Sequence, residues 1–244
     1  MNSKKEFNLP MKLISLNLLW GGQNRTESIL NYLLDHNVDL IVLSEFKNDK
    51  NGILIKETLK NEGYNFEDSN DENLGVLVAA KHPFTLIEKE TRWVEIELID
   101  TDLKVLGVYV PTGSRDKQVK DAFWQKILKY AKENQKNSCI ITGDFNSCGK
   151  EDTMNLTYNE KDLKELLSSD WVDSWASFKN DDSQRYTWYS HVGNGHRLDY
   201  TFLSPKLKEL IEIVDINHDS KAREEGLTDH SPIIFESRIA KLIC

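Results

Sequence analysis

Three short apolar segments of this chain each end in a polar residue that a buried strand does not need for packing. Asn17 follows KLISL, Glu45 follows LIVLS, and Asp144 follows CIITG. Apolar runs of this length are typical of strands buried on both faces. Functional side chains are commonly placed on the loops that leave such a rigid scaffold. The repetition therefore predicts several strands whose ends converge on one site.

The order of the elements predicts an α/β chain with two sheets covered by helices. Helices are expected over 24–36, where Asn24 and Glu27 form a capping box, and over 50–62, 116–135 and 161–168. Strands are expected over 12–17, 39–44, 63–67, 74–80, 92–99, 103–110, 138–142, 185–189, 197–203 and 231–236. The consecutive strands before residue 110 favour antiparallel pairing over strict βαβ alternation.

Length and composition are consistent with one large domain. The 244 residues, 39% of them hydrophobic, can bury a sizeable core. Residues 1–10 are polar and end in Pro10, so we interpret them as a short leader with freedom to move. Residues 11–244 show no repeat, no low-complexity tract and no convincing linker, and are predicted to form a single domain.

The acidic charge narrows the classes of partner. A net charge of −9 counts against a stable nucleic-acid binder, because phosphate contacts from basic residues supply most of that affinity. It counts less against an enzyme that touches phosphates briefly, since carboxylates gathered for a metal ion also lower the net charge. Composition alone favours neither a nucleic-acid binder nor an enzyme.

Cysteine usage and hydropathy indicate a cytoplasmic protein. Cys139, Cys148 and Cys244 are odd in number and lack paired spacing, which argues against a disulfide framework and a zinc knuckle. The first apolar run is broken by Ser15 and Asn17, and no apolar stretch reaches the ~18 residues of a membrane span. We therefore expect no signal peptide and no membrane association.

The carboxylates and amides near these strand ends suit a hard divalent cation. Mg²⁺ is usually bound by one or two carboxylates together with waters and substrate phosphate. Glu45, with either Asp229 or Asp144, could supply the carboxylates. Asn17 and Asn146 could orient a carboxylate, a water or a phosphate. This set predicts Mg²⁺ as the cofactor, with Mn²⁺ as the alternative.

A histidine with an acidic partner would add the second requirement for hydrolysis. Asp199 in HRLDY and His230 in TDH are the candidates for a pair that polarises or activates the attacking water. A metal ion with an activated water suffices for phosphodiester hydrolysis. Taken singly, each residue has a simpler interpretation as a cap or turn residue, as Asp144 and Asn146 in GDFN illustrate. Only the combination predicts a catalytic site.

Seven blocks occur in a fixed order along the chain. They are SLN (15–17), LSEF (43–46), VYVPTGSR (108–115), TGDFNS (142–147), YTWYS (186–190), HRLDYTFLS (196–204) and LTDHSPI (227–233). This series resembles the endonuclease/exonuclease/phosphatase superfamily over roughly residues 11–237, with GDFN and the final DH pair as its most specific elements. The resemblance implies a four-layer α/β sandwich, in which two packed mixed β-sheets are flanked by helices and the catalytic cleft lies at one edge.

The resemblance also implies roles for the metal-site residues. Glu45 matches the principal metal ligand, and Asn17 matches the neighbouring asparagine that supports the metal site. Asp229 matches the acidic residue near the metal. The domain over 11–244 is accordingly expected to be catalytic.

Four further residues match the family's catalytic groups. Asp144 matches the aspartate that activates the nucleophile or protonates the leaving oxygen, and Asn146 matches its partner at the phosphate site. His230 matches the phosphate-contacting histidine, paired with Asp199. These roles follow from the resemblance and await the geometry of the site.

Tyr109 favours one branch of the superfamily, and we count it with the catalytic residues. Many phosphatase, sphingomyelinase and pancreatic-type deoxyribonuclease members place a histidine at the matching strand end, whereas exonuclease III-like abasic endonucleases place a tyrosine. Trp188 and Leu198 then fall where that branch forms its pocket for a sugar that lacks a base. Aromatic and apolar walls suit such a sugar, because an intact base would not fit.

Several departures leave abasic-site specificity open. Ser44 stands where that branch usually has glutamine, Thr112 where asparagine is common, and His196 where it has tryptophan. We still interpret His196 and Arg115 as substrate-binding residues together with Trp188, although a tryptophan in a strand is as often part of the core.

The leading interpretation is a Mg²⁺-dependent DNA nuclease, either an abasic-site endonuclease or a 3′ exonuclease. Such an enzyme would bind DNA transiently, and no obligate protein partner is evident. One alternative is a phosphoesterase that acts on a small molecule or a lipid headgroup, which the acidic charge favours and Tyr109 disfavours. A non-catalytic binding module is the third, disfavoured because loss of function would not be expected to leave Glu45, Asp144 and His230 in place.

Overall fold

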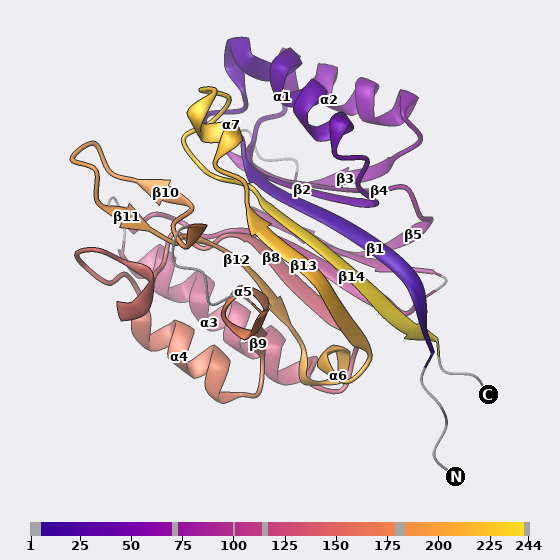
Figure 1. Ribbon diagram of the computed structural model, residues 1–244, viewed down its shortest axis with the longest axis vertical. Helices are drawn as coiled ribbons and strands as arrows, with labels where there is room; N and C mark the ends of the chain where they lie inside the picture. The colour runs from indigo at the N-terminus through magenta and orange to yellow at the C-terminus, as the bar shows by residue number, and fades with distance from the viewer. Residues whose placement is uncertain (1–5, 70–72, 100, 114–116, 179–183, 242–244) are drawn as a thin grey trace.

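Two six-stranded sheets pack against each other in the computed structural model, which describes residues 6–69, 73–99, 101–113, 117–178 and 184–241 (Figure 1). The first sheet has the order β13-β14-β1-β2-β4-β3 and contains β1 (Glu6–Asn17), β2 (Leu40–Phe46), β3 (Asn65–Asp68), β4 (Gly75–Ala80), β13 (Ile211–His218) and β14 (Ile233–Lys241). The second has the order β5-β6-β7-β8-β12-β9 and contains β5 (Phe84–Glu90), β6 (Trp93–Leu98), β7 (Leu103–Tyr109), β8 (Cys139–Asp144), β9 (Val172–Asp173) and β12 (Asp199–Leu203). A separate hairpin pairs β10 (Trp188–Tyr189) with β11 (Gly195–His196).

Helices cover the outer faces of both sheets (Figure 1). The first sheet carries α1 (Thr26–Asp35) and α2 (Lys50–Asn61), and the second carries α3 (Lys117–Glu133) and α4 (Glu160–Ser168). The shorter elements are η1 (Gln23–Arg25), η2 (Lys150–Asp152), α5 (Ser174–Phe178), α6 (Pro205–Lys208) and α7 (Lys221–Glu224). No helix in the described ranges is both long and apolar enough to cross a membrane. The predicted four-layer α/β sandwich with two mixed sheets is confirmed.

Three apolar layers hold the sandwich together, and β2 shows why its sequence is an unbroken apolar run. Successive side chains of a strand point to opposite faces of the sheet. Leu40 and Val42 lie in the core between the two sheets. Ile41 and Leu43 lie in the core beneath α1 and α2. A third core, between the second sheet and α3, completes the layers.

Two parallel strand pairs place the functional strand ends at one edge. Parallel strands need a long crossover, usually a helix. The crossover from β1 to β2 carries α1, and the crossover from β7 to β8 carries α3. In register, Asn17 lies beside Ser44 and Tyr109 lies beside Asp144. All other strand pairs in the described residues are antiparallel, so both sheets are mixed.

The first strand begins earlier than the sequence indicated. β1 starts at Glu6, so residues 6–10 of the expected leader belong to a strand that pairs with β14, while residues 1–5 lie outside the described part of the chain. Pro10 is tolerated because β1 pairs with β2 only from Leu13 onward. At Pro10 only one side of the strand is paired, and proline is confined to such edge-like positions.

Four strands were not predicted: the two-residue strands β9 and β11, and the longer β5 and β13. β5 reads FTLIEKE and β13 reads IEIVDINH, and each lies at the edge of its sheet. Their exposed and partly buried positions largely alternate, so the apolar content that marks a central strand is missing.

Gly107 should mark the closest approach of the two sheets. A Cβ at this position would lie 2.6 Å from Val78 Cγ2 and 2.9 Å from Val76 Cγ1. We expect Gly107→Ala to lower the free energy of unfolding by about 1–3 kcal/mol, the usual range for overpacking a core. Urea denaturation measures this free energy of unfolding. Gly149→Ala is the matched control, because the nearest atom to its new Cβ is 4.0 Å away. Equal unfolding free energies for the two variants would contradict this packing.

Candidate active site

A serine hydroxyl joins the two sheets directly beneath the site. Ser44 is buried near the end of β2, and its Oγ donates to the carbonyl oxygen of Val108 at 3.3 Å. The same Oγ accepts the backbone N–H of Asp144 at 3.2 Å. Ser44 stands where exonuclease III-like abasic endonucleases usually have glutamine. Here it links β2, which carries Glu45, to β7 and β8, which carry Tyr109 and Asp144.

The amide of Asn17 connects the carboxylates that end β2 and β8. Its Nδ2 donates to Asp144 Oδ2 at 2.9 Å and to Glu45 Oε1 at 3.3 Å. Its Oδ1 accepts the backbone N–H of Leu19 at 2.9 Å, which fixes the orientation of the amide. Asn17 is 1% exposed, so the group is shielded from water. The three residues that the sequence grouped by their position at strand ends are therefore in contact.

Glu45 occupies an irregular point of β2. Its φ is 54°, and the register with β4 shifts between Ser44 and Phe46. A bulge of this kind re-aims a side chain. Glu45 Oε2 accepts the backbone N–H of Trp20 at 2.7 Å, and Oε1 accepts the hydroxyl of Tyr109 at 3.1 Å. Burial and the nearby carboxylates of Glu45 and Asp144 raise the pKa of Tyr109 far above its usual value, so Tyr109 acts as a donor.

Asp144 is held from its own loop as well as from β1. Its Oδ1 accepts the backbone N–H of Asn146 at 2.7 Å, and its Oδ2 accepts the Asn146 side-chain amide at 3.1 Å. Asn146 has a φ of 46° and also donates to the carbonyl oxygen of Val110 at 2.9 Å. Burial, together with the neighbouring Asp199, raises the pKa of Asp144 above its usual range.

Asp199 and His230 form a buried pair next to Asp144. Antiparallel pairing of β12 with β8 sets Asp199 opposite Asp144. Asp199 Oδ2 lies 2.7 Å from His230 Nδ1, and both side chains are almost fully buried. Burial alone would lower the pKa of His230, but the charge and hydrogen bond of Asp199, helped by Asp144 and Asp229, raise it to about 10. The imidazole is therefore a cation in this site.

Asp229 is placed by a tryptophan rather than by the metal-site amide. Trp188 Nε1 donates to Asp229 Oδ2 at 3.0 Å. Asp229 Oδ1 lies 4.0 Å from His230 Nε2 and is buried without a hydrogen-bond partner among the described residues. A buried oxygen without a partner is costly, and a bound cation would satisfy it.

The oxygen-rich residues fit a divalent metal. Ligand atoms of Asp144, Asp199 and His230 all lie within 4.8 Å of one another. Because Asp199 and His230 are already bonded to each other, we assign them to each other and not to the metal. Glu45 and the unpartnered oxygen of Asp229 are the hard ligands that remain, which is the donor type that Mg²⁺ and Mn²⁺ prefer.

The residues predicted to bind substrate divide into exposed and buried members. Trp188 is partly exposed, whereas Leu198 and His196 are 7% and 3% exposed. His196 Nδ1 lies 2.9 Å from the hydroxyl of Thr153, and its ring centroid lies 5.7 Å from that of Trp188. His196 therefore supports Trp188 from behind. Arg115 lies outside the described residues.

The sequence did not identify Thr187 and Thr228, which bind backbone groups of the segments that carry the site residues. Thr187 is fully buried, and its Oγ1 accepts the backbone N–H groups of Leu198 and Asp199 at 3.0 and 3.3 Å. Thr228 donates to the carbonyl oxygen of Asn17 at 2.7 Å, and so ties the DH segment to β1. Both threonines belong to blocks singled out in the sequence, but no local pattern assigns them these partners.

Two buried cations were also missed. Lys120 Nζ donates to the backbone carbonyl oxygen of Asn146, and burial lowers the pKa of Lys120 to about 8. Arg197 is enclosed by two carboxylates: its Nε and Nη2 bond Asp152 at 2.8 and 2.9 Å, and its Nη1 bonds Asp173 at 2.9 Å. Arg197 thereby anchors the chain two residues before Asp199.

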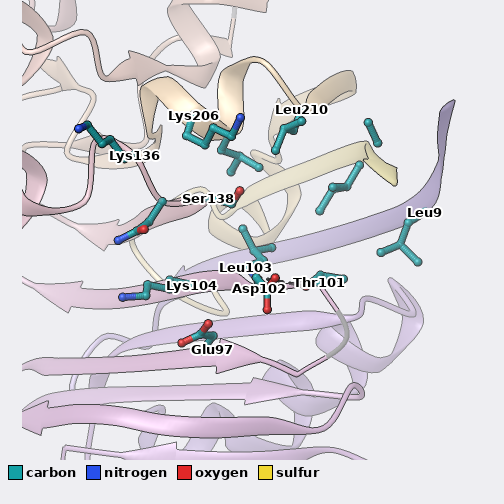
Figure 2. A pocket seen from close by; sticks show the side chains of 14 residues that line it. Leu9, Glu97, Thr101, Asp102, Leu103, Lys104, Lys136, Ser138, Lys206 and Leu210 are labelled. Carbon is teal, nitrogen blue, oxygen red and sulfur yellow. Dashed lines mark hydrogen bonds between the residues drawn. The ribbon is translucent and has the colours of Figure 1, made fainter. Parts of the chain in front are cut away.

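A cavity among the described residues lies at the opposite end of the sheets from the site (Figure 2). It measures about 590 Å³ and is lined at the starts of β1, β7 and β8 by Leu9, Leu103 and Ser138. These strands end in Asn17, Tyr109 and Asp144, so the cavity is separated from the site by the length of the strands.

Two packed mixed sheets with carboxylates, amides and a charged histidine at one edge define a four-layer α/β protein with a hydrolase-like site. The chain belongs to the Endonuclease/Exonuclease/phosphatase family, whose sequence model matches residues 14–230. It is 26% identical to an exodeoxyribonuclease of Bacillus subtilis over 91% of this chain and 98% of that protein. It is also 26% identical to a DNA-(apurinic or apyrimidinic site) endonuclease of Dictyostelium discoideum, over 91% of this chain and 69% of that protein.

A solved structure shares the fold. An AP endonuclease from Archaeoglobus fulgidus superposes with a TM-score of 0.79 at 19% identity, covering 92% of this chain and 98% of that one. The fold expected from the sequence is therefore found in a member of a nuclease class.

Two of the buried histidines, His230 and His218, should differ in charge near neutral pH in the metal-free protein. We expect His230 to be protonated, whereas burial and Arg197 lower the pKa of His218 to about 3 and keep it neutral. Asp199→Asn should bring the pKa of His230 towards or below the ordinary value of about 6.5. Nitrogen chemical shifts of labelled histidines measure both rings, and His218 serves as the internal control.

The same shift gives the sign of the pH dependence. Because the folded-state pKa of His230 is raised, the stability from its pairing with Asp199 is fully present below the unfolded pKa of about 6.5 and is lost as pH rises through about 10. A neutral His230 in the wild-type protein at neutral pH would contradict the assignment.

Proposed function

We propose that this chain is a metal-dependent phosphodiester hydrolase that acts on DNA, as an abasic-site endonuclease or a 3′ exonuclease, with a role in DNA repair. One observation carries the proposal: the Asn17 amide joins Glu45 to Asp144, and Asp144 lies beside the buried Asp199–His230 pair. These contacts support the proposal that Glu45 binds the metal, Asp144 transfers a proton and His230 binds the phosphate.

Mg²⁺ is the proposed cofactor, with Mn²⁺ as the alternative. Glu45 and Asp229 would hold the ion, and Asn17 would fix Glu45 from the side. When bound, the ion would act as a Lewis acid on the phosphate oxygens. The oxygen ligands and the unpartnered Oδ1 of Asp229 support this choice of metal.

Asp144 is the proposed proton-transfer group. Its raised pKa, which follows from burial and from Asp199, brings proton exchange with a water or a leaving oxygen closer to neutral pH. Hydrogen bonds from Asn17 and Asn146 fix the orientation of its carboxylate. Asp144 would take the proton of the attacking water or return a proton to the leaving oxygen.

His230 is the proposed phosphate-binding cation. Its Nδ1 is engaged by Asp199, which leaves the Nε2–H to donate to a non-bridging phosphate oxygen. The negative charge on that oxygen is met by a fixed imidazolium, and such preorganised charge is commonly a large contribution to catalysis. Tyr109 would add a neutral donor on the other side of Glu45.

DNA is favoured as the substrate by the relatives and by the cleft. The two similar proteins named above are an exodeoxyribonuclease and an endonuclease for apurinic or apyrimidinic DNA. Trp188 pairs with His230 through a β-bridge and is partly exposed, so its ring lies where a sugar next to the scissile phosphate could be bound. The net charge of −9 implies weak, transient and salt-sensitive binding.

The same charge favours a second candidate, a phosphoesterase for a small molecule or a lipid headgroup, because such a substrate needs no basic surface. The complete hydrogen-bonding of Glu45, Asp144 and Asp199 favours either enzyme over a non-catalytic module. The cytoplasmic location and the lack of an obligate protein partner stay predictions from the sequence.

A duplex with a single abasic analogue should be cut in Mg²⁺ and spared in EDTA. Asp144→Asn should lower kcat by about 10²–10⁴-fold, the usual contribution of a positioned proton-transfer group. His230→Ala should lower kcat by about 10²–10³-fold, the usual cost of removing one preorganised donor to a developing negative charge. Single-turnover cleavage on denaturing gels measures this. Asp102→Asn is the matched control, because Asp102 is exposed at the far end of β7 and lines the remote cavity.

The outcomes separate the two candidates. If abasic DNA, intact DNA and RNA are all untouched while a generic phosphodiester dye is hydrolysed, the nuclease proposal fails and the small-molecule candidate stands. If either active-site variant cleaves as fast as Asp102→Asn, the catalytic assignment itself is wrong.

A further inference from the structure

A tryptophan beside the metal-site carboxylate is left in solvent. Trp20 is 53% exposed, although its neighbour Leu18 is fully buried. Large aromatic side chains usually bury most of their surface, so an exposed one beside a reactive site calls for a partner. Trp20 belongs to the loop that connects β1 to η1 and begins immediately after Asn17.

The loop that presents Trp20 adopts an unfavourable backbone. Leu19, Trp20, Gly21 and Gly22 have φ values of 51°, 59°, 73° and 79°. Residues other than glycine avoid this region, and such conformations cluster at functional sites when the surroundings enforce them. The two non-glycine residues therefore mark a constraint that packing alone does not require.

Hydrogen bonds to the site enforce this conformation. The backbone N–H of Leu19 bonds Asn17 Oδ1 at 2.9 Å, and that of Trp20 bonds Glu45 Oε2 at 2.7 Å. Arg25 Nη2 donates to the carbonyl oxygen of Leu19 at 2.6 Å. The backbone that carries the indole is consequently held in a fixed place relative to the Glu45 carboxylate.

Trp20 forms one wall of a cleft that adjoins the metal site. The cleft measures about 450 Å³, within the usual range for small-ligand sites, and also includes Glu45, Lys47, Arg92 and Tyr109. The Arg92 guanidinium lies 4.6 Å from the ring centroid of Tyr109. The cleft therefore offers an aromatic face together with two cations, which is the chemistry that binds a base and its phosphate.

We propose that this cleft binds one unpaired nucleotide next to the scissile phosphate, with its base stacked on Trp20. The inference rests on the proposed nuclease function and names its substrate class: single-stranded DNA, or a strand end that frays. A base within an intact duplex is stacked on its neighbours and must be extruded before it can stack on a protein ring. Lys47 and Arg92 lie where they can meet the phosphate of the same nucleotide.

The position of the cleft supports this role. Trp188 flanks the site beside Asp229 and His230, and the buried His196 lies close to its ring. The Trp20 cleft instead adjoins Glu45 and Tyr109. A strand whose phosphate lies on the metal would have one nucleotide on each flank, and the Trp20 flank combines an exposed indole with the positive charge of Lys47 and Arg92.

Binding of a phosphorothioate-linked single strand in Mg²⁺ tests the stacking directly. We would place 2-aminopurine in turn at each nucleotide beside the central linkage and measure the quenching of its fluorescence by the protein. Wild-type protein should quench one position, and Trp20→Ala should abolish that quenching and raise Kd by about 5- to 150-fold, the range that alanine replacement of a stacking residue gives. Trp20→Phe should retain much of the quenching and much of the wild-type affinity.

Two controls separate stacking from collapse of the loop. Trp20→Ala keeps the backbone N–H that bonds Glu45, so Mn²⁺ affinity measured by electron paramagnetic resonance should not change. Ile99→Ala removes a side chain that is 58% exposed beyond the opposite end of β6, and should bind like wild type.

Cleavage rates then define the substrate class. Trp20→Ala should lower kcat/KM for the cleavage of single strands and frayed ends by about the factor by which it raises Kd. The kcat/KM for cleavage at an abasic site inside a stable duplex should be almost unchanged. Equal losses on both substrates, or quenching that survives in Trp20→Ala, would overturn the inference. If wild-type protein cuts no DNA at all, the proposed function fails, while the quenching still decides whether Trp20 stacks on a base.

Discussion

The amide of Asn17 is the contact on which the rest of the site depends. Glu45 and Asp144 come from different sheets, and their like charges would drive them apart. One buried amide donates to both carboxylates. The backbone carbonyl oxygen of Asn17 also accepts Thr228, so the segment that carries Asp229 is tied to the same residue. Three parts of the chain that are distant in sequence are therefore positioned by the end of β1.

The position of Asn17 follows from the sheet and not from the loop around it. β1 is a central strand, paired with β14 on one side and with β2 on the other, and its register sets Asn17 beside Ser44. Ser44 in turn bonds backbone groups of the second sheet. A rigid scaffold thereby determines the spacing of the catalytic groups, and the loops supply their orientation.

Electrostatics make the buried carboxylates tolerable. Asp144 and Asp199 face each other across β8 and β12 in a site that excludes water. Burial opposes charge on Asp144 and on His230, but a protonated His230 neutralises part of the cluster.

The sequence was sufficient where chemistry and local pattern coincide. β2 and β8 were predicted because they are short apolar runs, and Asp144 was predicted because it ends one of them. Lys120 lies in KQVKDAF, where nothing distinguishes a lysine that is buried under Asn146 from one in solvent. The partner of Lys120 is determined by how α3 packs against the second sheet, and the local sequence pattern does not encode that packing.

The two flanks of the site differ in how an aromatic residue is coupled to a carboxylate. Trp188 bonds Asp229 through its own indole N–H, so its partly exposed ring also orients the carboxylate. Trp20 reaches Glu45 through its backbone N–H, and its ring is free for substrate. Replacing Trp188 therefore disturbs substrate contact and carboxylate together, whereas replacing Trp20 removes only the ring. For that reason the Trp20 flank is where substrate recognition can be varied without altering the arrangement that performs the hydrolysis.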